Sequence, residues 1–125
     1  MRSTFVALVL SSMFTLGCGK SGESSSAGSA NIPPEAQAIF AQRCTPCHGA
    51  TGAGDGMASA SLTPRPRNFH DKVWQESVTD DHIEKIIIAG GAAVGKAPAM
   101  PGNPDLQAKA EVVKGLRAKI RSFGQ

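Results

Sequence analysis

Apolar residues follow three different patterns along this chain of 125 residues. A continuous apolar run, FVALVLSSMFTLG, comes first and is followed directly by the polar segment CGKSGESSSAGSA. Two later segments, around residues 83–87 and 112–123, carry apolar residues at helical spacing. Between these segments and the first helix, residues 49–78 are rich in glycine and proline and show no regular period. The pattern predicts a leader segment and an all-helical domain that contains one long irregular connection.

Start and stop signals place the expected helices. The first begins near Pro34, because proline is accepted at the first helical position, and Ile39 and Phe40 mark its apolar face. Another begins after Thr79, a favourable N-cap residue, and ends at the glycine pair that starts with Gly90. The last is expected from about residue 103 to residue 123, and its apolar stripe consists of Val112, Val113, Leu116, Ile120 and Phe123.

The leader predicts export and attachment to a membrane. Its apolar run is shorter than the roughly 20 residues that span a bilayer as a helix, and it follows Arg2 as the apolar region of a signal peptide does. The sequence TLGC resembles a bacterial lipobox, in which Cys18 receives the lipid. We therefore expect a signal peptide over residues 1–17, a lipidated cysteine with a flexible tether over 18–31, and a domain over 32–125. The protein is expected on the periplasmic side of a membrane. Cleavage after Ala30, which would give a soluble periplasmic protein, is the alternative.

The candidate chemistry is concentrated in CTPCH, which comprises Cys44, Cys47 and His48. A zinc site requires four ligands, but no fourth cysteine is present, and His70 and His82 are twelve residues apart. A dithiol redox site requires a strand before the first cysteine, and no alternating pattern precedes it. The motif C-x-x-C-H is the signature of covalent haem attachment, with the histidine as an iron ligand. The sequence therefore predicts one covalent haem c.

The sixth position on the iron separates electron transfer from ligand chemistry. Met100 is the main candidate, because Pro98 and Pro101 stiffen its loop and a weak thioether ligand cannot hold a floppy loop in place. Met57, His70 and His82 are the rival candidates.

These features together resemble a class I bacterial c-type cytochrome, a small electron carrier with one His–Met ligated haem. The resemblance covers roughly residues 33–123 and rests on CTPCHG, GAGDG…LTPRPRNF, VTDDHIEKIIIAGG and APAMP. It implies an all-α fold of four to five short helices wrapped around one covalent haem, and no enzymatic activity. It also implies that a carbonyl of Pro64 or Pro66 accepts a hydrogen bond from His48, and that Arg67 and Trp74 contact the haem propionates.

The resemblance further implies that the two terminal helices cross. In the family, a small residue and an aromatic residue on the first helix meet an aromatic residue on the last. Ala36 and Phe40 fit the first pair. Lys119 stands where similar sequences carry the last aromatic residue, and Phe123 is the candidate to replace it.

The net charge of the chain bears on its expected partners. The formal net charge of +3 falls near zero once Arg2 is removed and two haem propionates are added, so nucleic acid is not an expected partner. The expected partners are redox proteins that meet an exposed haem edge on a monomer. The basic last helix is a candidate docking surface. Two other functions stay open, namely a haem-based sensor or enzyme with a labile sixth ligand, and the electron-entry subunit of a larger oxidoreductase.

Overall fold

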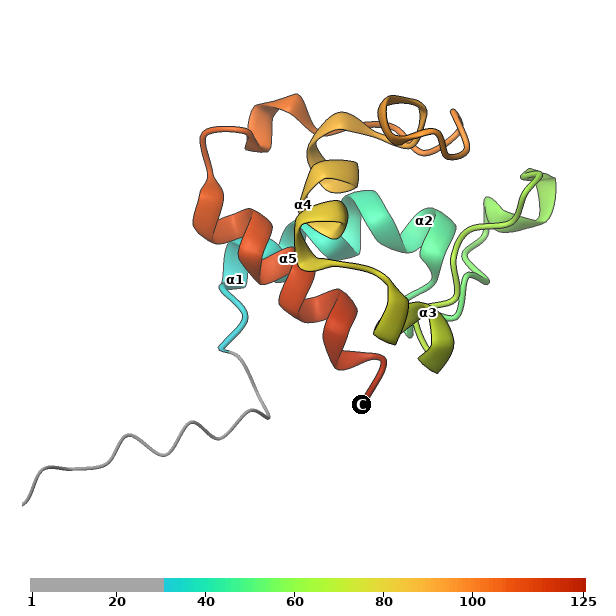
Figure 1. Cartoon of the computed structure of the whole chain (residues 1–125), viewed down its shortest axis with the longest axis horizontal. Coiled ribbons are helices and arrows are strands. Elements are labelled where there is room, and N and C mark those ends of the chain that lie inside the picture. Colours follow the sequence, from blue (N-terminus) through green and yellow to red (C-terminus); the bar gives the residue numbers. More distant parts are fainter. Residues whose placement is uncertain (1–30) are drawn as a thin grey trace, which may run out of the picture.

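The computed structural model describes residues 31–125, and every regular element in that part of the chain is helical (Figure 1). The predicted signal peptide and Cys18, the predicted lipidation residue, lie outside the described residues. Within residues 31–125, no helix has both the length and the apolar character needed to span a bilayer.

The first helix begins at Pro34, as predicted, and runs without interruption to the end of the CTPCH motif. It consists of α1 (Pro34–Ile39), the π-helical turn η1 (Phe40–Cys44) and α2 (Thr45–His48). The widened turn comes directly before Pro46, which has no N–H to donate to the carbonyl of Gln42 and whose ring would clash with that carbonyl in a regular helix. Proline within the motif therefore accounts for the change in helical pitch at Cys44, and such π-turns are frequent at functional sites.

The predicted signals at Thr79 and Gly90 are confirmed. Helix α4 spans Asp80–Ala89, and its N-cap Thr79 accepts a hydrogen bond at Oγ1 from the N–H of His82 at 3.2 Å. The helix ends at Gly90, whose φ of 82° favours a residue without a Cβ atom. The following connection contains the 3-10 turn η3 (Ala92–Val94).

The last helix begins later than predicted. Helix α5 spans Ala110–Ser122, and the segment expected to be its first turn is a separate 3-10 turn, η4 (Pro104–Leu106). The break occurs at Lys109, where φ is −112° and ψ is 61°, outside the helical region. The expectation of one helix from residue 103 was therefore wrong, although its apolar stripe is buried as predicted: Val112, Val113, Leu116 and Ile120.

The long connection expected to be irregular carries two short elements, the 3-10 turn η2 (Ser59–Ser61) and helix α3 (Lys72–Ser77). Helix α3 starts where Asp71 Oδ1 accepts a hydrogen bond from the N–H of Trp74 at 3.1 Å. In Figure 1, α3 lies beside the C-terminal end of the chain, and Lys72 Nζ donates to the carbonyl of Gly124.

Helices α1 and α5 cross, as predicted, and Ala36 there meets Gly115, which was not predicted. A Cβ atom on Gly115 would lie 2.8 Å from the Cβ of Ala36, so the two backbones approach more closely than any larger residue allows. Phe40 meets Phe123 at a centroid distance of 5.7 Å, which confirms Phe123 as the aromatic partner. Lys119 places its ammonium group 4.6 Å from the centroid of the Phe123 ring, so the lysine covers the aromatic pair.

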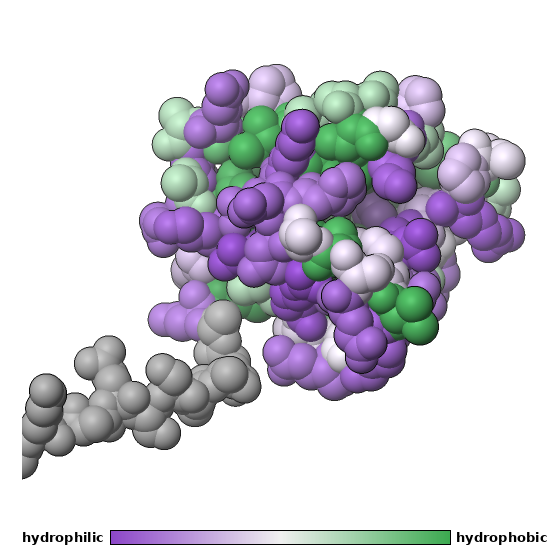
Figure 2. Space-filling view, in the orientation of Figure 1, coloured by the Kyte–Doolittle hydropathy of each residue, from purple (hydrophilic) through white to green (hydrophobic). Residues whose placement is uncertain are grey.

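The face that carries α5 is mostly hydrophilic (Figure 2). Its arginines are paired with the acidic start of α4: Arg121 Nη2 lies 2.7 Å from Asp80 Oδ1, and Arg117 Nη1 lies 2.9 Å from Glu84 Oε1. The side chains of Arg117, Arg121 and Glu84 are partly buried, whereas fully exposed ion pairs contribute only about 0–1 kcal/mol each. Two arginines of α5 and two carboxylates in the first two turns of α4 thus neutralise one another within the domain.

Candidate functional site

The CTPCH motif occupies the C-terminal end of the first helix. Cys44 closes the π-turn, while Cys47 and His48 belong to α2. Both cysteines are free thiols and are partly exposed. Burial raises the pKa of the Cys44 thiol to about 11, against a smaller opposing effect of the Arg43 guanidinium. Both thiols lie in adjacent segments of one continuous helix, and both are free for covalent attachment.

The loop after the motif holds the end of this helix in place. All four carbonyls of α2 accept hydrogen bonds from backbone N–H groups of residues 49–58, at 2.8–3.1 Å. The four donors are Gly49, Gly54, Gly56 and Ala58. Such partners replace the helical bonds that a helix end lacks. Gly54 is required here, because its φ is +77° and a Cβ atom on it would lie 2.6 Å from the carbonyl oxygen of Pro66.

The His48 ring is buried and is held at its inner edge by a backbone carbonyl. Its Nδ1 lies 3.1 Å from the carbonyl oxygen of Arg67. The prediction that Pro64 or Pro66 supplies this carbonyl is therefore wrong. The carbonyl of Pro66 instead packs against the backbone of Gly54, and the chain turns its next carbonyl toward the imidazole.

The face of the same ring is covered by Phe69, which sequence reasoning did not single out. The two rings are nearly parallel, with an interplanar angle of 14° and a centroid distance of 4.5 Å. Phe69 is 5 % exposed, and its N–H donates to the carbonyl of Gly52 at 2.8 Å. In sequence Phe69 is one aromatic residue in an aperiodic segment, so no local signal marked it.

These contacts leave the second ring nitrogen of His48, Nε2, available to bind a metal. Among the described residues, no protein group forms a hydrogen bond with Nε2. Burial lowers the pKa of His48, and this effect exceeds the opposite one of the Arg67 carbonyl. A neutral imidazole with Nδ1–H on a carbonyl and a free Nε2 is the form that binds a metal. Two thiols and this imidazole fit a covalent haem.

The alternative readings of the motif find no support in residues 31–125. In this part of the chain, no three His, Cys, Asp or Glu side chains are grouped so that they could hold a metal ion, as a zinc site requires. The same residues contain no strand before Cys44, as a thioredoxin-type dithiol site requires.

Arg67 and Trp74, predicted to contact propionates, lie next to one another. The Arg67 guanidinium carbon is 5.7 Å from the centroid of the Trp74 ring, and its Nη1 is 3.3 Å from Asp71 Oδ2. Trp74 also lines an open groove of about 340 Å³ together with His82 and Lys96. A larger groove of about 510 Å³ borders Thr45 and lies apart from Trp74. Neither groove is lined by His48 or Met100. The fit of this site to a haem is therefore supported by the two thiols and the imidazole of the CTPCH motif, and not by the shape of a groove.

Met100 lies in a connection whose backbone is pinned to the end of α4. Its carbonyl accepts a hydrogen bond from the N–H of Gly91 at 3.0 Å, and its N–H donates to the carbonyl of Ala97 at 3.1 Å. A Cβ atom on Gly91 would lie 2.1 Å from the Ala97 carbonyl oxygen, so glycine permits this close return of the chain. The flanking prolines and these bonds restrict the backbone on both sides of Met100.

The rival ligands are placed differently. Met57 is 98 % exposed at the tip of the loop after the motif. His70 is occupied through Nε2 by the carbonyl of Thr51 at 2.8 Å. His82 lies in the first turn of α4 and lines the smaller groove.

A helical domain with the CTPCH motif at a helix end defines the class of c-type cytochromes. The family model described as "Cytochrome c" matches residues 34–116, and the chain belongs to this family. It is a class I c-type cytochrome, and Cys44 and Cys47 have the spacing for its covalent haem c. The function of the family is haem-based electron transfer, generally outside the cytoplasm. No curated protein and no solved structure matched the chain.

Proposed function

We propose that this cytochrome is an electron carrier whose iron is closed on both sides, by His48 and by Met100. The observation that carries the first assignment is the arrangement of the buried imidazole, with Nδ1 on the Arg67 carbonyl and Nε2 without a partner in residues 31–125. The second assignment is supported by the pinned loop around Met100 and by the exposure of Met57.

The bound haem supplies a one-electron change between ferrous and ferric iron. His48 and Met100 would hold the iron and limit access to it. A thioether ligand favours ferrous iron and raises the potential. A carbonyl on Nδ1 orients the imidazole and increases its basicity. His48 and Met100 would together hold the iron, and a site closed by both residues would be suited to electron transfer and unsuited to binding oxygen or a substrate.

Addition of carbon monoxide to the reduced native protein tests this proposal. We expect no rapid change in the absorbance spectrum, because Met100 would have to leave the iron before the gas could bind. Rapid binding would contradict the carrier function and favour a sensor or enzyme with a labile sixth ligand. Purification from membranes in a fixed stoichiometry with a larger oxidoreductase would favour an electron-entry subunit over a free carrier.

Partners are proposed from the residues around the Met100 loop. Ala92, Ala93 and Ala99 are exposed there, and small side chains allow another protein to approach a haem edge closely. Transient redox encounters of this kind use interfaces below about 1,200 Å². We propose redox proteins as donor and acceptor, with the cytochrome as a monomer.

For the membrane anchor, we predict that Cys18→Ser releases the protein from membranes. The serine hydroxyl cannot take the thioether-linked lipid, so a haem-loaded protein should appear in the soluble fraction. Fractionation and intact mass measurement of the exported protein check this result, with Ser24→Ala in the tether as the matched control. A Cys18→Ser protein that stays in the membrane fraction would argue against the lipid.

A further inference from the structure

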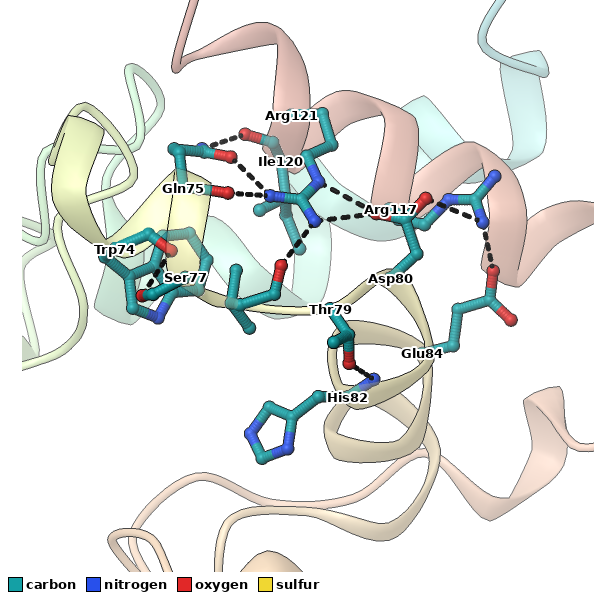
Figure 3. A network of polar contacts seen from close by, with 11 residues as sticks. Trp74, Gln75, Ser77, Thr79, Asp80, His82, Glu84, Arg117, Ile120 and Arg121 are labelled. Carbon is teal, nitrogen blue, oxygen red and sulfur yellow. Dashed lines mark hydrogen bonds and ion pairs between the residues drawn. The ribbon is translucent and has the colours of Figure 1, made fainter.

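Gln75 of α3 connects its own helix to the segment just before it, at Phe69, and to the distant helix α5. Its Nε2 donates to the carbonyl of Phe69 at 2.7 Å and to the carbonyl of Ile120 in α5 at 3.0 Å. Its Oε1 accepts from Arg121 Nη1 at 3.1 Å, and its backbone carbonyl accepts from the same nitrogen. Figure 3 shows the amide of Gln75 between Ile120 and Arg121.

The chemistry of its neighbours fixes the orientation of the Gln75 amide. The guanidinium of Arg121 can only donate, so it must face the amide oxygen, and the two carbonyls can only accept, so they must face the amide nitrogen. Arg121 is itself held by other bonds. Its Nη2 donates to the carbonyl of Val78 at 2.7 Å, and its Nε donates to Asp80 Oδ1 at 2.9 Å. The arginine therefore holds Gln75 in one position between α3 and α5 (Figure 3).

Gln75 is linked to His48 through its hydrogen bond with Phe69. Residues 67–69 touch the imidazole twice, through the Arg67 carbonyl at Nδ1 and through the Phe69 ring on its face. The N–H of Phe69 is bound to the carbonyl of Gly52, and its carbonyl is bound to Gln75. The Phe69 backbone is thus fixed on both sides, and Gln75 supplies one of the two bonds.

We propose that Gln75, held by Arg121, is a positioning residue that sets the orientation of the His48 imidazole through Phe69. The proposal rests on His48 being an iron ligand. Without the Gln75–Phe69 bond, segment 67–69 gains freedom, so the Phe69 ring and the Arg67 carbonyl no longer hold the imidazole in one orientation. Groups that bind a ligating histidine from behind determine its ring orientation and tune the metal.

The test uses Gln75→Leu in the haem-loaded full-length protein. Leucine has nearly the same size but forms none of the amide bonds. In the ferrous protein labelled with ¹⁵N-histidine, we expect the Nδ1 proton of His48 to exchange with solvent about tenfold faster. The loss of one ordinary hydrogen bond changes an equilibrium constant by about this factor. In the ferric protein, the electron paramagnetic resonance g-values should shift, because they depend on the direction of the imidazole plane.

Two further variants keep the result interpretable. Gln75→Glu retains an oxygen for Arg121 but cannot donate to the Phe69 and Ile120 carbonyls, so it should reproduce both spectroscopic changes even if the leucine variant fails to fold. Arg117→Gln removes a neighbouring contact, in which α5 is paired with Asp80 and Glu84 of α4, and Arg117 forms no bond with Gln75 among the described residues. It should lower the unfolding temperature and leave the His48 signals unchanged.

The outcomes separate this proposal from the ligand assignment. Unchanged His48 signals in both Gln75 variants, with an iron-bound histidine intact, would overturn the positioning role alone. Equal changes in Arg117→Gln would also overturn it, because a general loss of stability would then explain the effect. A native protein with no histidine on its iron would contradict the ligand assignment and this proposal with it.

Discussion

Met100→Ala is expected to leave the haem attached and to free one coordination position on its iron. Alanine cannot reach or bind the metal, so the ferrous variant should bind carbon monoxide rapidly. Loss of the thioether also removes its preference for ferrous iron. The midpoint potential should therefore fall by on the order of 0.1–0.3 V, a fraction of the roughly 0.8 V range that axial ligands span. Absorbance spectroscopy and redox titration measure both effects.

Met57→Ala is the matched control for this prediction. It removes the same side chain from a position that is 98 % exposed, so both the potential and the resistance to carbon monoxide should stay at their native values. The ligand assignment is contradicted if the Met100 variant behaves like the native protein, or if the Met57 variant is the one that changes.

The double variant Cys44→Ser, Cys47→Ser is expected to lose covalent haem completely. A serine hydroxyl does not form the thioether bonds, so the motif could then bind haem only through the bond between His48 and the iron. The exported protein should have the mass of the polypeptide alone, and acid–organic extraction should remove any colour that remains. Intact mass measurement and a pyridine haemochrome assay check this result.

A control for the double variant keeps both thiols and changes one of the two residues between them. Thr45→Ser conserves the hydroxyl that donates to the Phe40 carbonyl at 3.1 Å, so attachment should be normal. Haem that resists extraction from the double-serine protein would show that attachment does not depend on Cys44 and Cys47. The assignment of the motif would then be wrong.

Features governed by neighbouring residues were predictable from the sequence. Pro34 starts the first helix, Thr79 caps α4, and Gly90 ends it, because each effect depends on the conformation of one residue and on bonds within one helical turn. Phe123 also replaces the missing aromatic residue at Lys119, since the two lie on one face of α5. The break at Lys109 was missed because apolar spacing marks a stripe but does not mark where the helix begins.

The contacts that orient His48 could not be predicted in this way. Its carbonyl partner, Arg67, is 19 residues away across a connection without a period, so the path of that connection decides which carbonyl faces the imidazole. The same holds for the stacking of Phe69. The clamp between Arg121 and Gln75 joins residues 46 positions apart and depends on how α5 packs against α3.

The sequence by itself indicated the haem chemistry of this protein and part of its helical layout: two thiols and a histidine at fixed spacing, a methionine flanked by prolines, the start of the first helix and both ends of α4. These are local properties of residue type and spacing. The tertiary structure alone decided how the histidine is held, through the Arg67 carbonyl, the Phe69 ring and the Gln75–Arg121 contact. Those choices depend on where the folded chain brings distant backbone groups together, and no local rule contains that information.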